Sequence, residues 1–516
     1  MGIRVTTDGS VDCHSLGSIA ACLCGRSMSE QDRAIALYQF VRRLMFHYPQ
    51  RSERKAPDDL DAARLLNTYG YSFCSQQAIA LVGLWQAAGI AGEIWSMPGH
   101  VTAHARYGGG LHWFDPLIGA YVYRRGGSVV ASLPEIAADP TLLTRAVEEG
   151  RAPAGFLPCR SVLREDAERF CQHDPRYVST CRGLGGDLAF LAALAADARP
   201  WPWGRPDQPR YDGGATLRGG ERVVFLWETL PGEANCTSLK PGQRPRANVV
   251  APEELPPKHI CGAAAERRDV LHYRYWQPYA KRLGGVRTCR YQANGRHVYR
   301  PDFARPPTRD LFERNTFVWR PPARGEAALR VRRKGTIARL LCRLRTPHVY
   351  TSLAVTAAFH RAAADDVSRI CLSADRRRWL PVWDAARLGA RRGKVLAEAK
   401  LRDRIVGRRE LWIRLDCRTA GDPAKAGLAD LKIEGVFQHN MFARPYLVPG
   451  RNRITVHGCR DDLPEGRGLT VTWVWQEGRT TRRHRRDVSA LPASYVVETG
   501  GEATPRMVRL EIAAGR

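Results

Sequence analysis

The chain has 516 residues, of which 44% are hydrophobic and 26% charged, a size and balance that predict two or three folded domains and exclude a disordered or fibrous protein. Basic residues outnumber acidic ones by 80 to 52, giving a formal net charge of +28, so polyanions are partners to consider. Only nine of the 80 basic residues are lysines, so a GC-rich genome that favours arginine codons explains the excess as well as binding does.

Several classes of protein are not indicated. No recognition helix, Cys/His finger or paired-aromatic motif specific for nucleic acid accompanies the positive charge, and the longest apolar run, 78–84, is too short to cross a membrane. Fourteen scattered cysteines show no repeated Cys-x-x-Cys spacing, so no metal and no cofactor is predicted. Residues 1–6 lack the apolar segment of a secretory signal, so we expect a cytoplasmic location for the chain as written, and secretion if the natural start has been trimmed.

Helical signals occupy the first 150 residues. Ser29 is a predicted N-cap, and apolar side chains at helical spacing continue from it to Tyr48. A second helix is predicted over 58–67 and a third over 74–89. A capping box that begins at Ser132 predicts a further short helix.

Antiparallel strands are predicted between these helices. Residues 92–97 and 100–107 have strand-like patterns, and the glycines at 108–110 form a turn that returns the chain into 111–116. Helices therefore come first and a small antiparallel sheet follows, which is typical of an α+β fold.

A Pro-, Trp- and Gly-rich stretch at 198–206 is the predicted first boundary. Beyond it, short strand-like runs replace the helices. These runs are 223–227, 297–299, 411–416, 431–434, 454–456 and 469–475. The predicted organisation is an α+β domain over 1–200, a loop-rich β domain over 205–335 and a β-sandwich over 336–516.

Cys74 is the candidate nucleophile, because it begins an apolar helix. Unpaired N–H groups and a partial positive charge at a helix N-terminus stabilise a thiolate. Further along the chain, His100 begins a predicted strand and Asp115 ends the next one. Attack by a thiol on an acyl carbon needs an imidazole to accept the proton and a third group to orient that imidazole. Cys74, His100 and Asp115 are the predicted catalytic residues.

Through these residues, the sequence resembles the transglutaminase-like branch of the papain-like cysteine peptidase superfamily. The resemblance covers roughly residues 10–150 and is carried by Cys74 at a helix start, Ala88-Gly89-Ile90 after that helix, Gly99-His100 entering a strand, and Phe114-Asp115-Pro116. It implies a core in which the cysteine helix packs against an antiparallel sheet that carries the histidine and the aspartate.

The base and the oxyanion hole remain open at this point. Many family members have an acidic residue four positions after the histidine, where this chain has His104. A tight hairpin centred on Gly109 would place Asp115 nearest Ala103 or His104, which favours His104 as the base, whereas the family pattern favours His100. We retain His100, with His104 as the alternative. Candidates for the second oxyanion-hole donor are Asn67, Tyr69, Tyr71 and Gln76.

Two histidine features of the sequence suggest roles other than catalysis. The spacing of His100 and His104 would also suit a metal pair on one face of a strand, but no carboxylate-rich helix accompanies them. His112 beside Trp113 is expected to pack in the core.

The C-terminal part resembles a galactose-binding-like jelly roll over 435–440 and 449–456, with a turn at 373–379 similar to the Asp-box of sialidase-like proteins. A carbohydrate ligand is therefore an expectation. Four tryptophans could stack on sugars, although a core position is the stronger expectation for each; they are Trp379, Trp383, Trp473 and Trp475. An arginine-rich run at 479–486 is expected to be a solvated turn, or to hold an acidic glycan or nucleic-acid backbone by charge.

The main hypothesis is a cysteine-dependent acyl-transfer enzyme that hydrolyses, or transfers the acyl group of, a peptide or protein amide through a thioester. The alternative is a non-catalytic protein that binds carbohydrate or another polyanion and retains a transglutaminase-like fold. No membrane span is expected.

Overall fold

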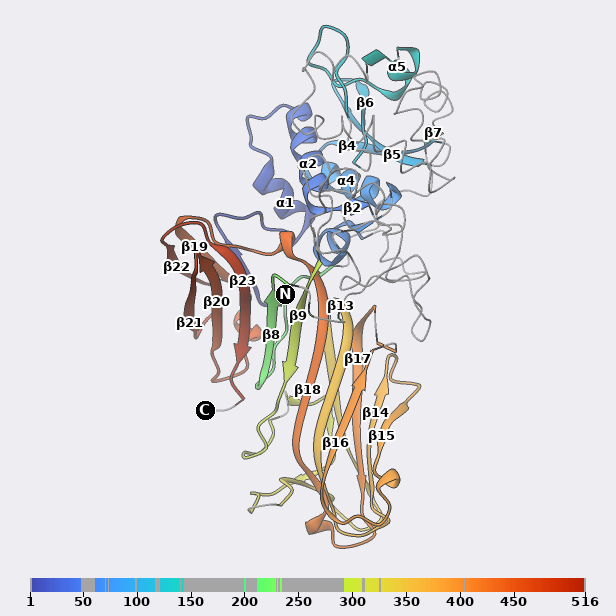
Figure 1. The fold of residues 1–516 in the computed structure, drawn as a ribbon, viewed down its shortest axis with the longest axis vertical. Coiled ribbons are helices and arrows are strands. Elements are labelled where there is room, and N and C mark those ends of the chain that lie inside the picture. The colour runs from blue at the N-terminus through green and yellow to red at the C-terminus, as the bar shows by residue number, and fades with distance from the viewer. Residues whose placement is uncertain are drawn as a thin grey trace.

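The chain forms one elongated molecule in the computed structural model (Figure 1). The structure describes residues 2–47, 61–69, 71–72, 74–97, 100–116, 121–139, 141–142, 199–200, 211–228, 230, 233, 292–308, 311–323 and 326–514 without 403 and 406. Within these residues, no helix is long and apolar enough to span a membrane.

Strands dominate the described structure, and its α-helices all precede residue 139. The helices are α1 (Leu16–Leu23), α2 (Glu30–Leu44), α3 (Ala62–Arg64), α4 (Cys74–Ala87) and α5 (Leu133–Ala138), and the π-helical segment η2 (Leu65–Tyr69) continues directly from α3. They lie together at one end of the molecule, next to the ends of the long strands (Figure 1). The predicted mixture of helices and strands is thus confirmed in its coarse form, with sheets in the majority.

A four-stranded antiparallel sheet packs against the helices. Its order is β6 (Gly110–Phe114), β5 (His100–Tyr107), β4 (Ala91–Met97) and β7 (Arg199–Pro200). Gly108 and Gly109 form the two-residue turn between β5 and β6, and both have positive φ angles, 55° and 77°. Such a turn matches the twist of a hairpin and requires residues that tolerate positive φ.

Local sequence signals located most of these elements correctly. Ser29 caps α2 by accepting a hydrogen bond from the backbone of Asp32, and Ser132 forms the predicted capping box at α5. The predicted end of α2 at Tyr48 is wrong, because the helix stops at Leu44. The chain then extends into β2 (Phe46–His47), which pairs in parallel with β3 (Tyr71–Ser72). This long-range pairing overrides the helical periodicity.

Most of the remaining strands form one large sheet that includes strands from both predicted β regions. The order is β15-β14-β17-β13-β18-β9-β8-β23-β20-β21, and β10, β11, β12 and β16 attach beside this path. The strands are β8 (Glu221–Leu226), β9 (Gln292–Tyr299), β10 (Arg314–Asn315), β11 (Val318–Trp319), β12 (Leu329–Arg330), β13 (Ile337–Arg361), β14 (Val367–Ser373), β15 (Leu380–Asp384), β16 (Gly393–Leu401), β17 (Arg408–Arg418), β18 (Gly427–Asn440), β20 (Leu469–Glu477), β21 (Thr480–Val488) and β23 (Thr504–Ile512). The predicted domain boundaries themselves stay predictions, and most of the stretch 198–206 lies outside the described residues.

The N-terminal segment belongs structurally to the β part of the molecule. Strand β1 (Arg4–Thr7) pairs with β19 (Gly450–His457), which in turn pairs with β22 (Ala493–Thr499). Ile3 is buried in the β core, and the N-terminus lies beside β8 in Figure 1. The chain therefore starts in the β region before it enters the helices.

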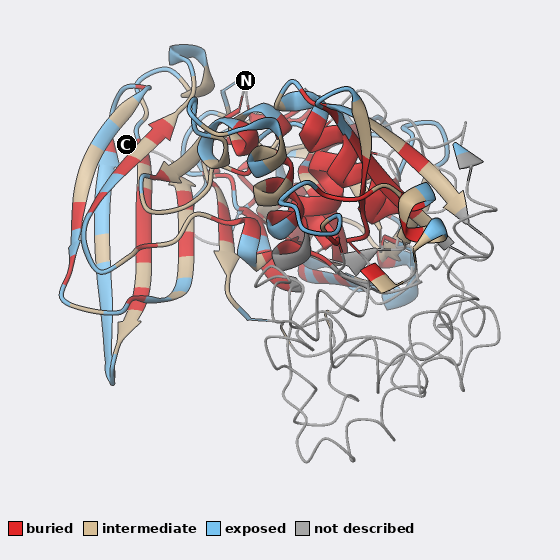
Figure 2. Cartoon of the chain, turned by 90° about the horizontal axis from the view of Figure 1, so that it is seen from above, coloured by how far each residue is buried: buried red, intermediate tan, exposed pale blue. Residues whose placement is uncertain are grey.

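Buried polar contacts join the helical and β parts. The amide nitrogen of Asn440, at the end of β18, donates hydrogen bonds to the carbonyl oxygens of Leu44 at 2.9 Å and Leu66 at 2.7 Å. The side-chain nitrogen of Gln438 donates to the carbonyl of Thr68. Because Asn440 and Gln438 are buried and hydrogen-bonded, these contacts fix η2 on the end of the large sheet. Buried residues fill the helical layer above this junction (Figure 2).

A largely buried ionic network ties β8, β9 and β13 together. Glu221 accepts hydrogen bonds from Arg218 at 2.9 and 3.0 Å and from His297 at 2.7 Å, and His297 also contacts the hydroxyl of Tyr350 at 2.8 Å. Burial alone would raise the pKa of Glu221, but the positive charge of Arg218 and the contact with His297 outweigh it and lower the pKa to about 2. The carboxylate is therefore ionised in the folded protein.

Glu221→Gln is expected to lower the free energy of unfolding at pH 7 by about 3 kcal/mol, because it leaves the Arg218 guanidinium buried without a counter-charge. Denaturant unfolding measures the change. Glu511→Gln is the matched control, since Glu511 makes part-exposed ion pairs with Arg222 and Arg509 and should change stability by less than about 1 kcal/mol.

The Glu221 effect should also depend on pH. The folded-state pKa of about 2 lies below the ordinary value of 4.5, so the carboxylate's contribution is complete above about pH 4.5 and disappears as the pH falls toward 2. The stability difference between wild type and Glu221→Gln should shrink over that range. A difference that stays constant between pH 5 and pH 2 would contradict the network described above.

Candidate active site

Helix α4 is the central element of the site. All ten residues from Gln76 to Trp85 are buried, as expected for a helix that is apolar all round and surrounded by protein. The neighbours are α1, α2 and α3 among the helices and β4 and β5 in the sheet. Cys74 is the first residue of α4 and is only half-buried, and it forms no disulfide within the described structure.

The start of α4 lies at the same end of this layer as the start of β5. Trp85, near the end of α4, packs so closely on Gly92 at the start of β4 that a Cβ atom there would lie 3.1 Å from the indole. From Trp85 back to Cys74 the helix spans about 16 Å, and from Gly92 to Met97 the strand spans about the same length. With α4 running antiparallel to β4, these ideal lengths place Cys74 level with Met97, whose backbone pairs with that of His100.

Asp115 directly follows β6 and is completely buried. The β5–β6 ladder ends with Ala103 opposite Phe114, so Asp115 lies one step further along, level with Thr102. The expectation that Asp115 would lie nearest Ala103 or His104 is therefore wrong by one residue, because the hairpin turns about two residues rather than one.

Register does not decide between the two candidate histidines, since Thr102 lies two residues from His100 and two from His104. The surroundings of His104 separate them. Its side chain is 0% exposed, its ring centroid lies 4.6 Å from that of Trp95, and neither ring nitrogen has a hydrogen-bond partner among the described residues. Burial, and to a smaller extent the neighbouring His112, lowers the pKa of His104 to about 3.

His104 is thus a neutral core histidine and a weak base at neutral pH. A catalytic histidine needs a partner that holds its ring, and no contact of this kind is made by His104 in the described structure. His100 is left as the candidate base. Its backbone begins β5, and its side chain lies outside the described part of the structure.

Hydrogen bonds seen in the structure exclude one of the four oxyanion-hole candidates. The two N–H groups of the Asn67 amide are both used, since its nitrogen donates to the carbonyls of Cys13 at 2.7 Å and Ala63 at 2.8 Å. Asn67 is therefore not free to stabilise an oxyanion. Gln76 is buried in the first turn of α4. Tyr69 ends η2, and the side chain of Tyr71 lies outside the described residues.

Thr102 is a residue of this region that sequence reasoning did not single out. Its hydroxyl donates to the carbonyl of Phe114 at 3.0 Å and accepts from the indole N–H of Trp113 at 2.8 Å. These two bonds fix the end of β6 against β5, directly beside Asp115. The only sequence feature that could have pointed to Thr102 is its place as a small polar residue midway between the two candidate histidines.

His112 has the structural role that the sequence predicts. It is buried, stacks on Tyr107 with ring centroids 3.7 Å apart, and hydrogen-bonds to the carbonyls of Tyr107 and Val130. In the described part of the chain, no group of three or more His, Cys, Asp or Glu side chains is arranged to hold a metal ion.

The C-terminal motifs are mainly structural. Trp473 and Trp475 are 3% and 5% exposed, so they belong to the core and are not sugar platforms. Trp379 and Trp383 are half-buried, the first under Arg414 and the second stacked on Phe359.

The two remaining motifs lie on the surface. In the turn at 373–379, the carboxylate of Asp375 accepts hydrogen bonds from the backbone N–H groups of Arg377 and Arg378. The arginine-rich run is not a turn, as it forms most of β21, the exposed edge strand of the large sheet.

No protein-family model matches the chain, and no curated protein sequence matches it significantly.

Two substitutions on β5 test the roles assigned to His104 and Thr102. His104→Leu removes a buried polar ring without hydrogen-bond partners, so its free energy of unfolding should equal or exceed that of wild type, by up to about 1 kcal/mol. Thr102→Val leaves the buried Trp113 N–H without an acceptor and should cost about 1 to 3 kcal/mol. Chemical unfolding compares the pair. A large loss of stability in His104→Leu would show that the ring has a polar partner.

Proposed function

We propose that the chain is a transglutaminase-like cysteine enzyme that cleaves an amide by acyl transfer. Two features support the proposal. The start of β5 at His100 and the end of β6 at Asp115 lie at one end of the antiparallel sheet, and the ideal lengths of helix and strand place the start of α4 at Cys74 level with that end. The order Cys, His, Asp and the helix-on-sheet packing are those that the family resemblance implies.

The chemistry follows from these positions. The Sγ atom of Cys74 attacks the carbonyl carbon of the amide, and its proton passes to His100. As the C–N bond breaks, His100 returns this proton to the leaving amine, and a thioester remains on Cys74. Water then attacks the thioester with His100 as base, which releases the carboxylic acid and restores the thiol. Asp115 holds the imidazole in the required tautomer throughout.

Helix α4 contributes electrostatically to the first step. The helix has fourteen residues and begins at Cys74. The first N–H groups of a helix have no partner within it, and the partial positive charge at this end favours a thiolate. The half-exposed position of Cys74 agrees with access for a polymer substrate. Hydrolysis is proposed rather than cross-linking because water needs no binding site for a second substrate. The β region would dock the enzyme on a polymer such as a glycan.

Iodoacetamide labelling as a function of pH tests the proposal. Cys74 should label rapidly at about pH 6 to 7, where an ordinary thiol is mostly protonated. His100→Ala should slow this labelling at least about tenfold, and Asp115→Asn should slow it less. Peptide mass spectrometry follows each cysteine separately.

Two other cysteines and one histidine of the chain serve as controls for this experiment. Cys22 and Cys459 are exposed, and a hydrogen bond to Asp462 raises the pKa of Cys459, so both should label slowly below pH 8. His104→Leu should leave Cys74 labelling unchanged. Labelling of Cys74 no faster than that of Cys22, or slowed by His104→Leu and not by His100→Ala, would overturn the assignment.

A further inference from the structure

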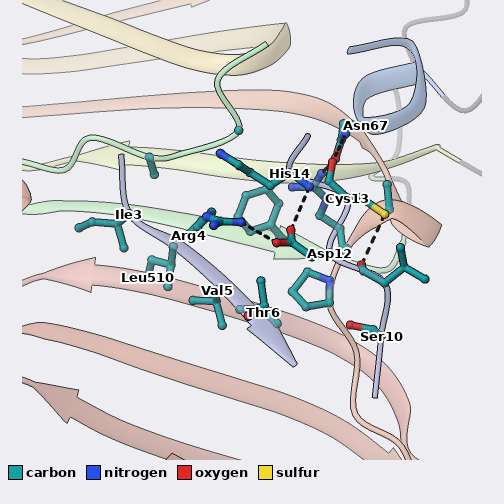
Figure 3. Close-up of a pocket in the computed structure, with 18 of the residues that line it drawn as sticks. Ile3, Arg4, Val5, Thr6, Ser10, Asp12, Cys13, His14, Asn67 and Leu510 are labelled. Carbon is teal, nitrogen blue, oxygen red and sulfur yellow. Dashed lines mark hydrogen bonds and ion pairs between the residues drawn. The ribbon is translucent and has the colours of Figure 1, made fainter. Parts of the chain in front are cut away.

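A small cavity lies where the N-terminal segment, η2 and the large sheet meet (Figure 3). Its volume is about 60 Å³. Residues from six separate parts of the chain line it, among them Arg4, Asp12, His14, Asn67, Tyr211 and Arg444.

Arg444 is the unusual member of this lining. Its side chain follows the short helix η8 (Met441–Ala443) and is only 8% exposed. One terminal nitrogen donates to the side-chain oxygen of Asn67 and, at 3.5 Å, to the hydroxyl of Tyr211, and the guanidinium lies over the ring of Phe225. Its Nε–H has no hydrogen-bond acceptor among the described residues.

No carboxylate forms an ion pair with Arg444 within the described part of the chain. The cavity does contain a carboxylate, Asp12, but this group is already paired with Arg4 at 2.7 Å. A buried guanidinium without a counter-ion is strongly unfavourable, because burial removes its hydration. The cavity walls therefore carry one uncompensated positive charge.

His14 adds a second group that can bind an anion. Its ring lies beside Tyr211 at the cavity wall, where a Cβ atom on Gly213 would clash with both. Burial and the charges of Arg4 and Arg444 lower the pKa of His14, while Asp12 and Asp212 oppose this. Because burial is the largest of these causes, His14 is neutral at pH 7 and offers an anion a ring N–H rather than a charge.

We propose that the cavity binds a small oxyanion, with the carboxylate, phosphate or sulfate class of ion as its ligand and Arg444 as its main contact. An oxyanion would accept a charge-assisted hydrogen bond from the Arg444 guanidinium and would neutralise the buried charge. A cavity of this volume has room for an ion of a few heavy atoms. The bound ion would connect the N-terminal segment, η2 and the large sheet, and this proposal is independent of the catalytic one.

Thermal unfolding of the full chain tests the proposal. The melting temperature is measured in sodium phosphate, sodium sulfate and sodium acetate against sodium chloride at equal ionic strength. A ligand that binds only the folded state raises the melting temperature with its concentration. We expect at least one of the three oxyanions to do so beyond the effect of chloride, and isothermal titration calorimetry with that ion to give one site per chain.

Variants locate the site. Arg444→Met should abolish the ion-specific rise, Arg444→Lys should weaken binding at least about tenfold because the planar fork is lost, and His14→Asn should weaken it several-fold. Arg451→Met, at an exposed position on the neighbouring strand β19, should bind like wild type. Circular dichroism checks that each variant folds. If Arg444→Met does not fold, Arg444→Lys and His14→Asn test whether the ion binds at this cavity.

Two outcomes would overturn the site. The first is a wild-type protein that none of the three ions stabilises more than chloride does. The second is an ion-specific rise that is the same in folded Arg444 variants and in His14→Asn as in wild type, which would place the ion elsewhere on the basic surface.

Discussion

The burial of α4 is the constraint on which the candidate site depends. Ten consecutive residues of this helix are inaccessible to solvent, so the helix cannot rotate or slide without opening the core on every side. Close contact between Trp85 and Gly92 fixes its far end on β4, and the regular rise of helix and strand then brings Cys74 level with the start of β5. The proposed nucleophile, base and orienting carboxylate belong to three different parts of the helix–sheet layer. The packing of α4 on the sheet, rather than closeness in the sequence, would hold the three side chains in position.

The helices and strands around the candidate site could be predicted from the sequence, because local signals determine them. Capping residues, helical spacing and a glycine turn are readable over a few positions, and α4, β4, β5 and β6 all lie where these signals put them. The position of Asp115 was predicted one residue away from where it lies, because the number of residues in a Gly-Gly-Gly turn depends on φ angles that the sequence does not display. His100 and His104 could not be separated for a similar reason. Both lie on the same strand, and only the surroundings of His104, a buried ring against Trp95 with no hydrogen-bond partner in the described structure, distinguish it.

Contacts between distant segments could not be predicted at all. Asn67 looked like an oxyanion-hole donor from its place before Cys74, yet its amide is committed to Cys13, Ala63 and Arg444, the last of these 377 residues away. The same applies to β1, which pairs with β19. These contacts make the junction between the helical part and the large sheet a buried polar region rather than a flexible linker. A change in the β region near Asn440 can therefore affect η2, the segment that precedes the candidate nucleophile.

The central claim is that Cys74 is a nucleophile activated by its position. The most direct test is to mix the protein with p-nitrophenyl acetate near neutral pH, quench it at intervals and determine the mass and the modified residue. The account predicts that one acetyl group forms rapidly on Cys74, is then lost to water, and does not form in Cys74→Ala. Slow acetylation spread over Cys22, Cys459 and the lysines, without preference for Cys74, would contradict it.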